Sequence, residues 1–208
     1  DEYLHSFNNA TTHLIHTDGK GVERITEKGV VFAGEEFPVD CIIFASGFEV
    51  GTPLQRRTGF DPKGKSRKRL SDHWSDGMRT LHGLQVADFP NSFIVQATQG
   101  ANLISNYPSN LSDSAKTIAS IIAHMLENES KVVEVKTEAE EKWVQLIMSG
   151  SGAMLGSQDC TPGYYNNEGI DPGPSRKSFA GYPFGPLAFF NYISEWRNSG
   201  DFIGLKFR

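Results

Sequence analysis

Cysteine is scarce in this sequence of 208 residues, and the two cysteines that occur stand far apart. Cys41 lies in an apolar run and Cys160 follows much later, so the two lack the paired spacing of a zinc site. Two cysteines are also too few for a disulfide-rich secreted scaffold. The sequence therefore favours a reducing, cytoplasmic setting.

Long hydrophobic runs are missing as well. The longest, such as Cys41 to Ala45 and Leu187 to Phe190, are far shorter than the roughly 20 apolar residues that a membrane-spanning helix needs. The N-terminal stretch DEYLHSFNNA contains no methionine and neither the basic nor the apolar segment of a signal peptide. We therefore expect no membrane span, and the chain has the character of a piece of a longer protein.

Positive charge is in short supply, with a formal net charge of −5 at pH 7 and a pI near 5.7. This balance argues against a nucleic-acid partner, because neutralising phosphates needs clustered lysine and arginine. One basic run, KGKSRKR at 63–69, departs from it. Gly64 and Ser66 interrupt that run and no aromatic residue alternates with its charges, so a solvated loop is favoured over a phosphate-binding patch.

The six histidines show no metal-ligand pattern. His13 and His16 are three residues apart in an expected strand, so their side chains would point to opposite faces. His73 and His124 have no neighbour at ligand spacing. The sequence therefore predicts no metal site.

Short β-type runs separated by turn residues fill residues 12–46. The runs are THLIHT, VERI, GVVF and VDCIIFAS, and the pairs Asp18-Gly19, Lys28-Gly29 and Ala33-Gly34 separate them. Such pairs supply the positive φ of tight hairpin turns, so we expect a small antiparallel meander that leads into one buried strand at 39–45. A second buried strand is expected at 92–97, after the turn residues Pro90 and Asn91.

The clearest helix is predicted at about 111–127, where apolar residues recur at spacings of three and four. Ser109 and Ser112 are its candidate caps. The apolar stripe expected to face the core consists of Leu111, Ala115, Ile118, Ile122, Met125 and Leu126.

Two further helices are marked by their ends. One begins with a capping box, TEAE, in which Thr137 and Glu140 would satisfy each other's backbone donors, and it ends at Gly150. The other begins at Pro186 and runs to about residue 198, with Gly200 as its stop. The residues expected on the buried faces are Trp143, Leu146 and Ile147 in the first of these helices and Phe189, Ile193 and Trp196 in the second.

A glycine-rich phosphate loop is absent, although DCIIFASGFE at 40–49 is typical of a dinucleotide-fold strand that ends at its cofactor. GSGAMLG at 150–156 contains a Gly-x-Gly pattern, but a helix precedes it and no strand-helix pattern follows. A flexible helix end is therefore favoured there. The loop at 150–185 is rich in glycine, proline, serine and asparagine, and so long a loop in a compact domain is usually functional or disordered. Its aromatic residues argue against disorder.

Several stretches together carry a family resemblance. They are DCIIFASGFEVG, LSDHWSDGMRTLHGLQVADFPNSFIVQATQGANLISNYPSN and CTPGYYNNEG, in this order. The most specific elements are the Ala-Ser-Gly turn at 45–47 and the pattern G-L-x-x-x-x-F-P-N-x-F from Gly83 to Phe93; the SNY run at 105–107 and the TPGYYN loop also fit. Over nearly its whole length the chain resembles the C-terminal part of flavin-containing monooxygenases of the Baeyer-Villiger type.

The resemblance implies an α/β fold, the C-terminal portion of an FAD-binding flavoprotein with two dinucleotide-binding, Rossmann-like domains. Within this chain we expect a small β-meander, a central strand pair and about three helices. Residues 1–110 would be the C-terminal part of the FAD-binding domain, and 111–208 the helical C-terminal region, with 150–185 as a lid over NADP and substrate. The glycine-rich loops for FAD and NADPH would lie in the missing N-terminal part of the same protein, which would be the partner of this chain.

Cofactor contacts are implied at two places near the flavin. The segment 100–107 would run under the flavin and open the long helix, with backbone amides near Ile104, Asn106 and Tyr107 as the candidate donors. The alternative is simple helix capping by Ser105 and Asn106. Ala45, Ser46 and Gly47 would lie against a cofactor, because small residues let a ligand approach the backbone, and the alternative there is a tight turn.

A third set of contacts is implied on the nicotinamide side, from Cys160, Tyr164, Tyr165 and Asn166. Family members often carry tryptophan where this chain has Cys160, and the alternative for the tyrosines is to anchor the loop. Cys160 has no basic neighbour that would activate its thiol. The arginine that the family uses in catalysis would precede Asp1, so no catalytic residue is assigned.

The function implied by the resemblance is that NADPH reduces FAD, reduced FAD binds O2, and one oxygen atom is inserted into a small ketone to give an ester or a lactone. Another flavoprotein NAD(P)H oxidoreductase, or an N- or S-oxygenating monooxygenase, is an alternative with the same turn and helix. The aromatic-rich lid favours the Baeyer-Villiger type. A non-catalytic fragment or subunit that needs a partner is the other alternative, and its exposed apolar face would favour self-association.

Overall fold

The computed structural model describes residues 2–47, 54–96, 98–101, 106–150 and 178–208. Contacts group the chain into two compact units, Asp1–Phe48 and Glu49–Arg208. The functional division expected near residue 110 stays a prediction.

The first unit contains the predicted antiparallel meander. A short helix, α1 (Glu2–Ser6), precedes the strands β1 (Arg24–Ile25), β2 (Gly29–Phe32) and β3 (Glu35–Pro38), which form one sheet in the order β1-β2-β3. Ala33 and Gly34 connect β2 to β3, and both have positive φ, 53° and 76°. This is the backbone of a tight hairpin turn whose twist suits the strands, so the meander is confirmed.

The buried strand expected at 39–45 is wrong. This segment has no strand conformation; Cys41 is exposed, and Ile43 and Phe44 keep 85% and 77% of their surface accessible. The expected strand at 12–17, which includes His13 and His16, is also absent. An apolar run becomes a buried strand only when neighbouring strands take up its backbone hydrogen bonds, and among the described residues no strand lies beside 39–45.

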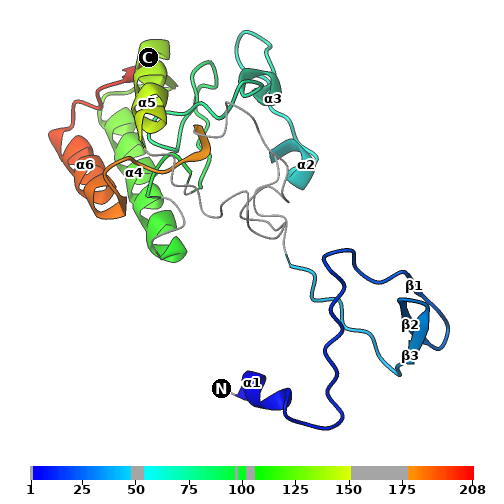
Figure 1. The fold of residues 1–208 in the computed structure, drawn as a ribbon. Helices are drawn as coiled ribbons and strands as arrows, with labels where there is room; N and C mark the ends of the chain where they lie inside the picture. Colours follow the sequence, from blue (N-terminus) through cyan, green and yellow to red (C-terminus); the bar gives the residue numbers. More distant parts are fainter. Residues whose placement is uncertain (1, 48–53, 97, 102–105, 151–177) are drawn as a thin grey trace. The chain divides into compact units, whose positions relative to one another are not determined.

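The second unit is built on three long helices, as predicted. They are α4 (Tyr107–Glu127), α5 (Thr137–Ser149) and α6 (Pro186–Ser199), and the short helices α2 (Leu54–Thr58) and α3 (Leu70–His73) precede them. Figure 1 shows α6 lying beside α4, in agreement with their contacts. The buried face of α6 is the predicted one, Phe189, Ile193 and Trp196, and Gly200 ends the helix with a left-handed φ of 71°.

The expected central strand pair is wrong in both members. Residues 92–96 are irregular, and Ile94 reaches the rest of the unit by donating its N–H to the Leu84 carbonyl at 2.7 Å. The strands that do form are β4 (Val133–Val135) and β5 (Leu205–Phe207), an antiparallel pair of three residues each. Such short runs carry too little alternation to be recognised in a sequence.

The helix α4 buries a different face from the expected stripe. Its buried residues are Asn110, Thr117 and Ile121, whereas Ile122 and Leu126 remain 44% and 75% exposed. Polar contacts explain the rotation, because Arg197 of α6 pairs with Asp113 at 2.9 Å and donates to the Thr117 hydroxyl at 2.8 Å. An apolar periodicity cannot report a helix face that packs through such an ion pair.

The G-L-x-x-x-x-F-P-N-x-F pattern has a structural explanation. Gly83 has a φ of 72°, and a Cβ added there would lie 2.6 Å from the Thr98 carbonyl oxygen, so only glycine fits. Phe89 is buried against Leu70. The Asn91 side chain donates to the Lys131 carbonyl at 3.0 Å and accepts from the Val133 N–H at 2.8 Å. The motif therefore holds the segment 83–91 against β4 and against the segment that leads into α4.

Neither a membrane-spanning helix nor a metal site is expected from the sequence. None of the helices in the described ranges is long and apolar enough to cross a membrane. Within the same ranges, no group of three or more histidine, cysteine, aspartate or glutamate side chains is arranged to hold a metal ion.

Candidate functional site

The N-terminus of α4 presents backbone amides for which the described part of the chain shows no acceptor. The cap is Asn106, whose side chain accepts from the Ser109 N–H at 3.2 Å, so neither Ser109 nor Ser112 is the cap. Pro108 stands in the first turn and has no N–H. Because the first amides of a helix have no partner within it, the N–H groups of Asn106 and Tyr107 are left to meet other acceptors. Both residues are exposed, at the positive end of a long helix dipole.

Asn106→Ala is expected to lower the free energy of unfolding by about 1 kcal/mol, because the Ser109 N–H loses its acceptor. Asn106→Asp is the matched control, since it keeps a side-chain oxygen at the same place. Urea unfolding followed by circular dichroism measures both. If the two variants were equally stable, the side-chain oxygen at position 106 would contribute nothing to the helix.

The segment before α4 is fixed by Gln99, which is fully buried and has a positive φ of 60°. Its side-chain oxygen accepts from the Thr80 hydroxyl at 2.5 Å, and its amide nitrogen donates to the carbonyls of Met78 at 2.8 Å and Ser178 at 2.7 Å. These bonds join the Gln99 side chain to Met78, Thr80 and Ser178, which are all distant from it in the sequence. This network fixes the backbone at 98–101 immediately ahead of the candidate segment.

The same segment is paired with the chain at 178–182. Gln99 donates its N–H to the Ala180 carbonyl at 2.9 Å, and Tyr182 donates its N–H to the Gly100 carbonyl at 2.8 Å. Trp143 of α5 donates its indole N–H to the Gln99 carbonyl at 3.0 Å. The approach to α4 and the last part of the expected lid, at 178–182, are thereby joined in one hydrogen-bonded layer.

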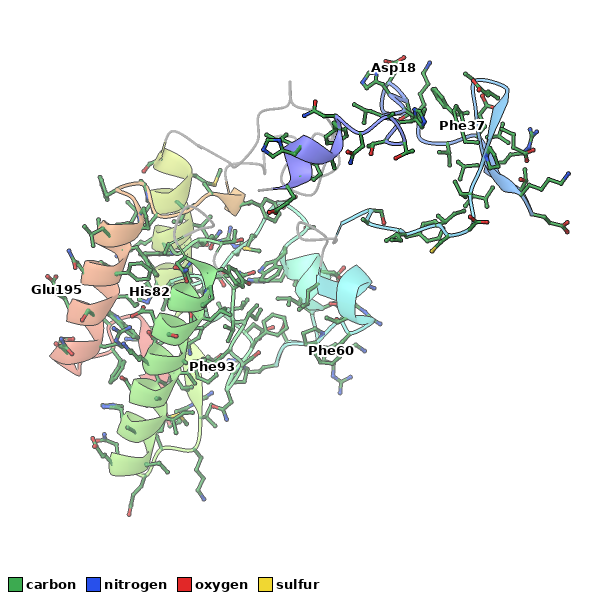
Figure 2. The ribbon with its side chains drawn as sticks, turned by 90° about the horizontal axis from the view of Figure 1, so that it is seen from below. Asp18, Phe37, Phe60, His82, Phe93 and Glu195 are labelled. Carbon is green, nitrogen blue, oxygen red and sulfur yellow. The ribbon has the colours of Figure 1, made fainter. Side chains whose placement is uncertain are left out.

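Behind this layer lies a buried histidine. His82 is 7% exposed, and its ring lies edge to face with Trp143 and Trp196, with centroids 4.7 and 4.8 Å apart. Figure 2 shows His82 inside the unit next to α4 and α6, while Glu195 points away from α6. Burial lowers the pKa of His82 from 6.5 to about 3, because the charged ring would lose its hydration.

This shift predicts an acid-sensitive fold. Below about pH 6.5 the unfolded chain binds a proton at His82 and the folded chain does not, so the free energy of unfolding falls as the pH drops toward 3. We expect His82 to account for a loss of about 1 kcal/mol between pH 7 and pH 5.5. Urea unfolding at both pH values measures it. His82→Phe should remove that share of the loss, and an unchanged pH dependence in this variant would contradict the assignment.

The sequence-predicted site residues fall into three groups. Asn106 and Tyr107 lie at the N-terminus of α4, as expected. Ala45, Ser46 and Gly47 are exposed at the end of the first unit, and Gly47 has a φ of 87°. The remaining candidates, Ile104, Cys160, Tyr164, Tyr165 and Asn166, lie outside the described residues.

Sequence reasoning missed the polar residues that support this region. Gln99, Thr80 and Ser178 are buried and come from three separate segments, so no spacing in the sequence connects them. The one available signal was a polar residue, Gln99, beside glycine and shortly after the apolar run at 93–95. Buried polar groups need partners, and such a residue is therefore a candidate for a structural network.

Comparison with known proteins gives a consistent result, although no family model matches the chain. Pentalenolactone D synthase of Streptomyces arenae is 41% identical over 211 residues, 100% of this chain and 36% of that protein. FAD-binding monooxygenase hmp7 of Hypomyces subiculosus is 40% identical, over 99% of this chain and 34% of its own length. Baeyer-Villiger monooxygenase 4 of Dietzia sp. (strain D5) is 36% identical, over 100% and 33%. The chain thus spans about a third of the length of the curated relatives it matches.

Solved structures agree with the sequence relatives. The polycyclic ketone monooxygenase of the thermophilic fungus Thermothelomyces thermophila is similar with a TM-score of 0.88 and 32% identity, over 100% of this chain and 34% of that one. An oxidised steroid monooxygenase bound to NADP has the same fold, with a TM-score of 0.79 and 20% identity, over 100% and 37%. The chain therefore corresponds, over its whole length, to a C-terminal part of the flavin-containing monooxygenases of the Baeyer-Villiger type.

Proposed function

We propose that this chain supplies the C-terminal part of an FAD- and NADPH-dependent monooxygenase that inserts one oxygen atom of O2 into a small ketone to give an ester or a lactone. The observation that carries the proposal is the match along the entire chain to proteins named as FAD-binding and Baeyer-Villiger monooxygenases. The missing N-terminal part of the same protein would be its partner, in a Rossmann-like two-domain flavoprotein of the cytoplasm. Bound FAD, once reduced by NADPH, supplies the oxygen-activating chemistry.

The N-terminus of α4 fits a flavin. The free N–H groups of Asn106 and Tyr107 would donate to the N1–C2=O edge of the ring system, where negative charge collects on reduction. The dipole of a 21-residue helix adds to their effect. The Gln99 network holds the backbone at 98–101, ahead of this helix end.

The other candidate contacts complete the proposal. Ala45, Ser46 and Gly47 would let the cofactor approach the backbone at the end of the meander unit. Cys160, Tyr164, Tyr165 and Asn166 would cover the nicotinamide of NADP as part of a lid at 150–185. Exposed apolar side chains such as Ile43 and Phe44 would be covered by the missing part, and without it they favour self-association.

A backbone substitution tests the helix amide directly. Tyr107→Pro removes one N–H at a helix position where proline is well tolerated, and Tyr107→Ala loses the same side chain but keeps the N–H. If this amide holds the flavin, the proline variant should bind FAD about tenfold more weakly than the alanine variant, since a hydrogen bond to a charged group contributes about 1.5–3 kcal/mol. FAD titration followed by visible absorption and flavin fluorescence measures this. Equal affinities would remove Tyr107 from the site.

The product identifies the reaction. The chain can replace the corresponding third of an FAD-binding relative, and the chimeric protein can be supplied with NADPH, O2 and a cyclic ketone. Formation of a lactone supports the proposal. Oxidation of NADPH without an oxygenated product would instead indicate a reductase, and exclusive formation of sulfoxides or N-oxides from matching substrates would indicate the N- or S-oxygenating alternative.

A further inference from the structure

Three redox-active rings are stacked in the second unit. Trp143 of α5 lies parallel to Tyr182 and to Tyr192 of α6, with centroids 5.5 Å apart in both pairs and interplanar angles of 15° and 26°. Tyr182 and Tyr192 also face each other, at 5.8 Å and 24°. Parallel, offset rings at such distances are one of the two arrangements that aromatic pairs prefer. Parallel π-systems at this distance exchange an electron readily.

A proton acceptor accompanies the stack. The Tyr192 hydroxyl lies 3.1 Å from Nε2 of His82, and the His82 ring also contacts Trp143 edge to face. His82 is neutral because burial lowers its pKa to about 3, so one ring nitrogen keeps a free lone pair. Burial, and to a smaller extent the charge of Tyr182, raises the pKa of Tyr192, so the phenol keeps its proton. In the tautomer of His82 that carries its proton on Nδ1, the phenol donates a hydrogen bond to Nε2.

Tyrosine and tryptophan are among the side chains most easily oxidised by one electron. A phenol is oxidised far more easily when a base takes its proton in the same step, because the oxidised phenol is a strong acid. Even a weak base such as a buried histidine accepts a proton from so strong an acid. Tyr192 has such a base within hydrogen-bonding distance and a tryptophan ring stacked on it.

We propose that Trp143, Tyr182, Tyr192 and His82 form a redox-active site that takes up a one-electron oxidising equivalent and holds it as a neutral radical on Tyr192. The oxidant belongs to the class of strong one-electron oxidants, such as hydroxyl or peroxyl radicals. It accepts one electron from the stack and is reduced. The O–H bond of Tyr192 breaks, its proton moves to Nε2 of His82 to give an imidazolium ion, and the phenoxyl radical remains. A thiol or ascorbate returns the electron, and the proton goes back to Tyr192.

The position of the stack gives the oxidising equivalent a direction. Trp143 is 4% exposed, and its indole N–H binds the Gln99 carbonyl in the segment that leads to α4. Tyr182 and Tyr192 are only partly buried. An oxidising equivalent that arises at a flavin bound near the start of α4 would thus reach Trp143 first. It would then pass to the less buried Tyr182 and Tyr192, away from the interior. Only this source of the oxidant rests on the proposed function, because the stack is complete without a flavin.

The test uses the chain itself without cofactor. Photo-oxidised ruthenium tris-bipyridine serves as the one-electron oxidant, and transient absorption distinguishes the narrow tyrosyl band from the broad tryptophanyl band. We expect a long-lived tyrosyl signal that forms more slowly in D2O. Tyr192→Phe and His82→Phe should each lose most of this signal and leave the tryptophanyl band. Tyr3→Phe is the matched control, because Tyr3 is 74% exposed and lies outside the stack, and it should change nothing.

A second measurement needs no substitution and so does not depend on the folding of a variant. After exposure to the same oxidant, peptide mass mapping locates the oxidised side chains. Preferential oxidation of Tyr192 and Tyr182 over the far more exposed Tyr3 supports the site. Oxidation that follows solvent exposure, with Tyr3 modified first, would overturn it, and so would an undiminished tyrosyl signal in Tyr192→Phe. Flavin takes no part in either measurement, so the outcome is independent of the proposed monooxygenase function.

Discussion

Replacing Glu140 by alanine is expected to lower the free energy of unfolding by about 3–5 kcal/mol, enough to leave much of the second unit unfolded. The Glu140 side chain is fully buried in α5. Its carboxylate accepts from the Ala87 N–H at 2.8 Å and lies 3.0 Å from Nε2 of His73 and 3.4 Å from Nε of Arg79. Removing it leaves the Ala87 N–H without its acceptor and takes away the carboxylate that His73 and Arg79 share. Urea unfolding monitored by circular dichroism measures the loss.

Two controls separate burial from charge. Glu141→Ala removes the next carboxylate, which is 55% exposed and only 3.9 Å from Arg79, and such surface pairs contribute about 1 kcal/mol or less. Glu140→Gln keeps an acceptor for the Ala87 N–H and should fall between the two. If Glu140→Ala and Glu141→Ala were equally stable, the buried carboxylate would have no special role in joining α5 to the segment at 73–87.

The role of Glu140 was predicted wrongly from the local sequence pattern around it. The TEAE spacing predicted a capping box, yet Lys136 is the N-cap residue and no side chain caps the helix. The prediction of a helix start was right, because it depends on residues close in sequence. The role of the glutamate was wrong, because its partners come from a segment more than fifty residues earlier, which no spacing rule includes.

The helices and the strands differ in predictability for the same reason. A helix satisfies its own backbone, so Pro186, Gly200 and the apolar spacing between them were sufficient for α6. A strand needs partners, and the run at 39–45 found none among the described residues. The α4 face was misjudged because the Arg197–Asp113 pair joins it to α6 and Ile121, outside the expected stripe, is its buried apolar residue in the shared core. At the candidate site, the apolar spacing placed the helix start too late, at about 111, whereas the family resemblance had 100–107 open the helix, which begins at Tyr107. Neither revealed the buried network of Gln99.

Gln99→Leu is the second substitution with a large expected effect, a loss of about 3 kcal/mol or more. Leucine fills much of the same volume but leaves the buried carbonyls of Met78 and Ser178 without a donor and the Thr80 hydroxyl without its acceptor. Each unsatisfied buried group costs about 1–3 kcal/mol. Thermal and urea unfolding give the size of the loss.

Hydrogen exchange shows where that loss acts. If Gln99 joins the approach to α4 with the chain at 178–182, Gln99→Leu should speed the exchange of the Tyr182 N–H, which is bonded to the Gly100 carbonyl. Exchange in β4, away from Gln99, should follow only the global loss. Gln96→Leu is the matched control, because Gln96 is only partly buried and its one hydrogen bond within the described residues goes to the Met78 sulfur at 3.3 Å. If the two leucine variants proved alike, Gln99 would be one buried side chain among others, and the donors at the start of α4 would owe their position to the helix alone.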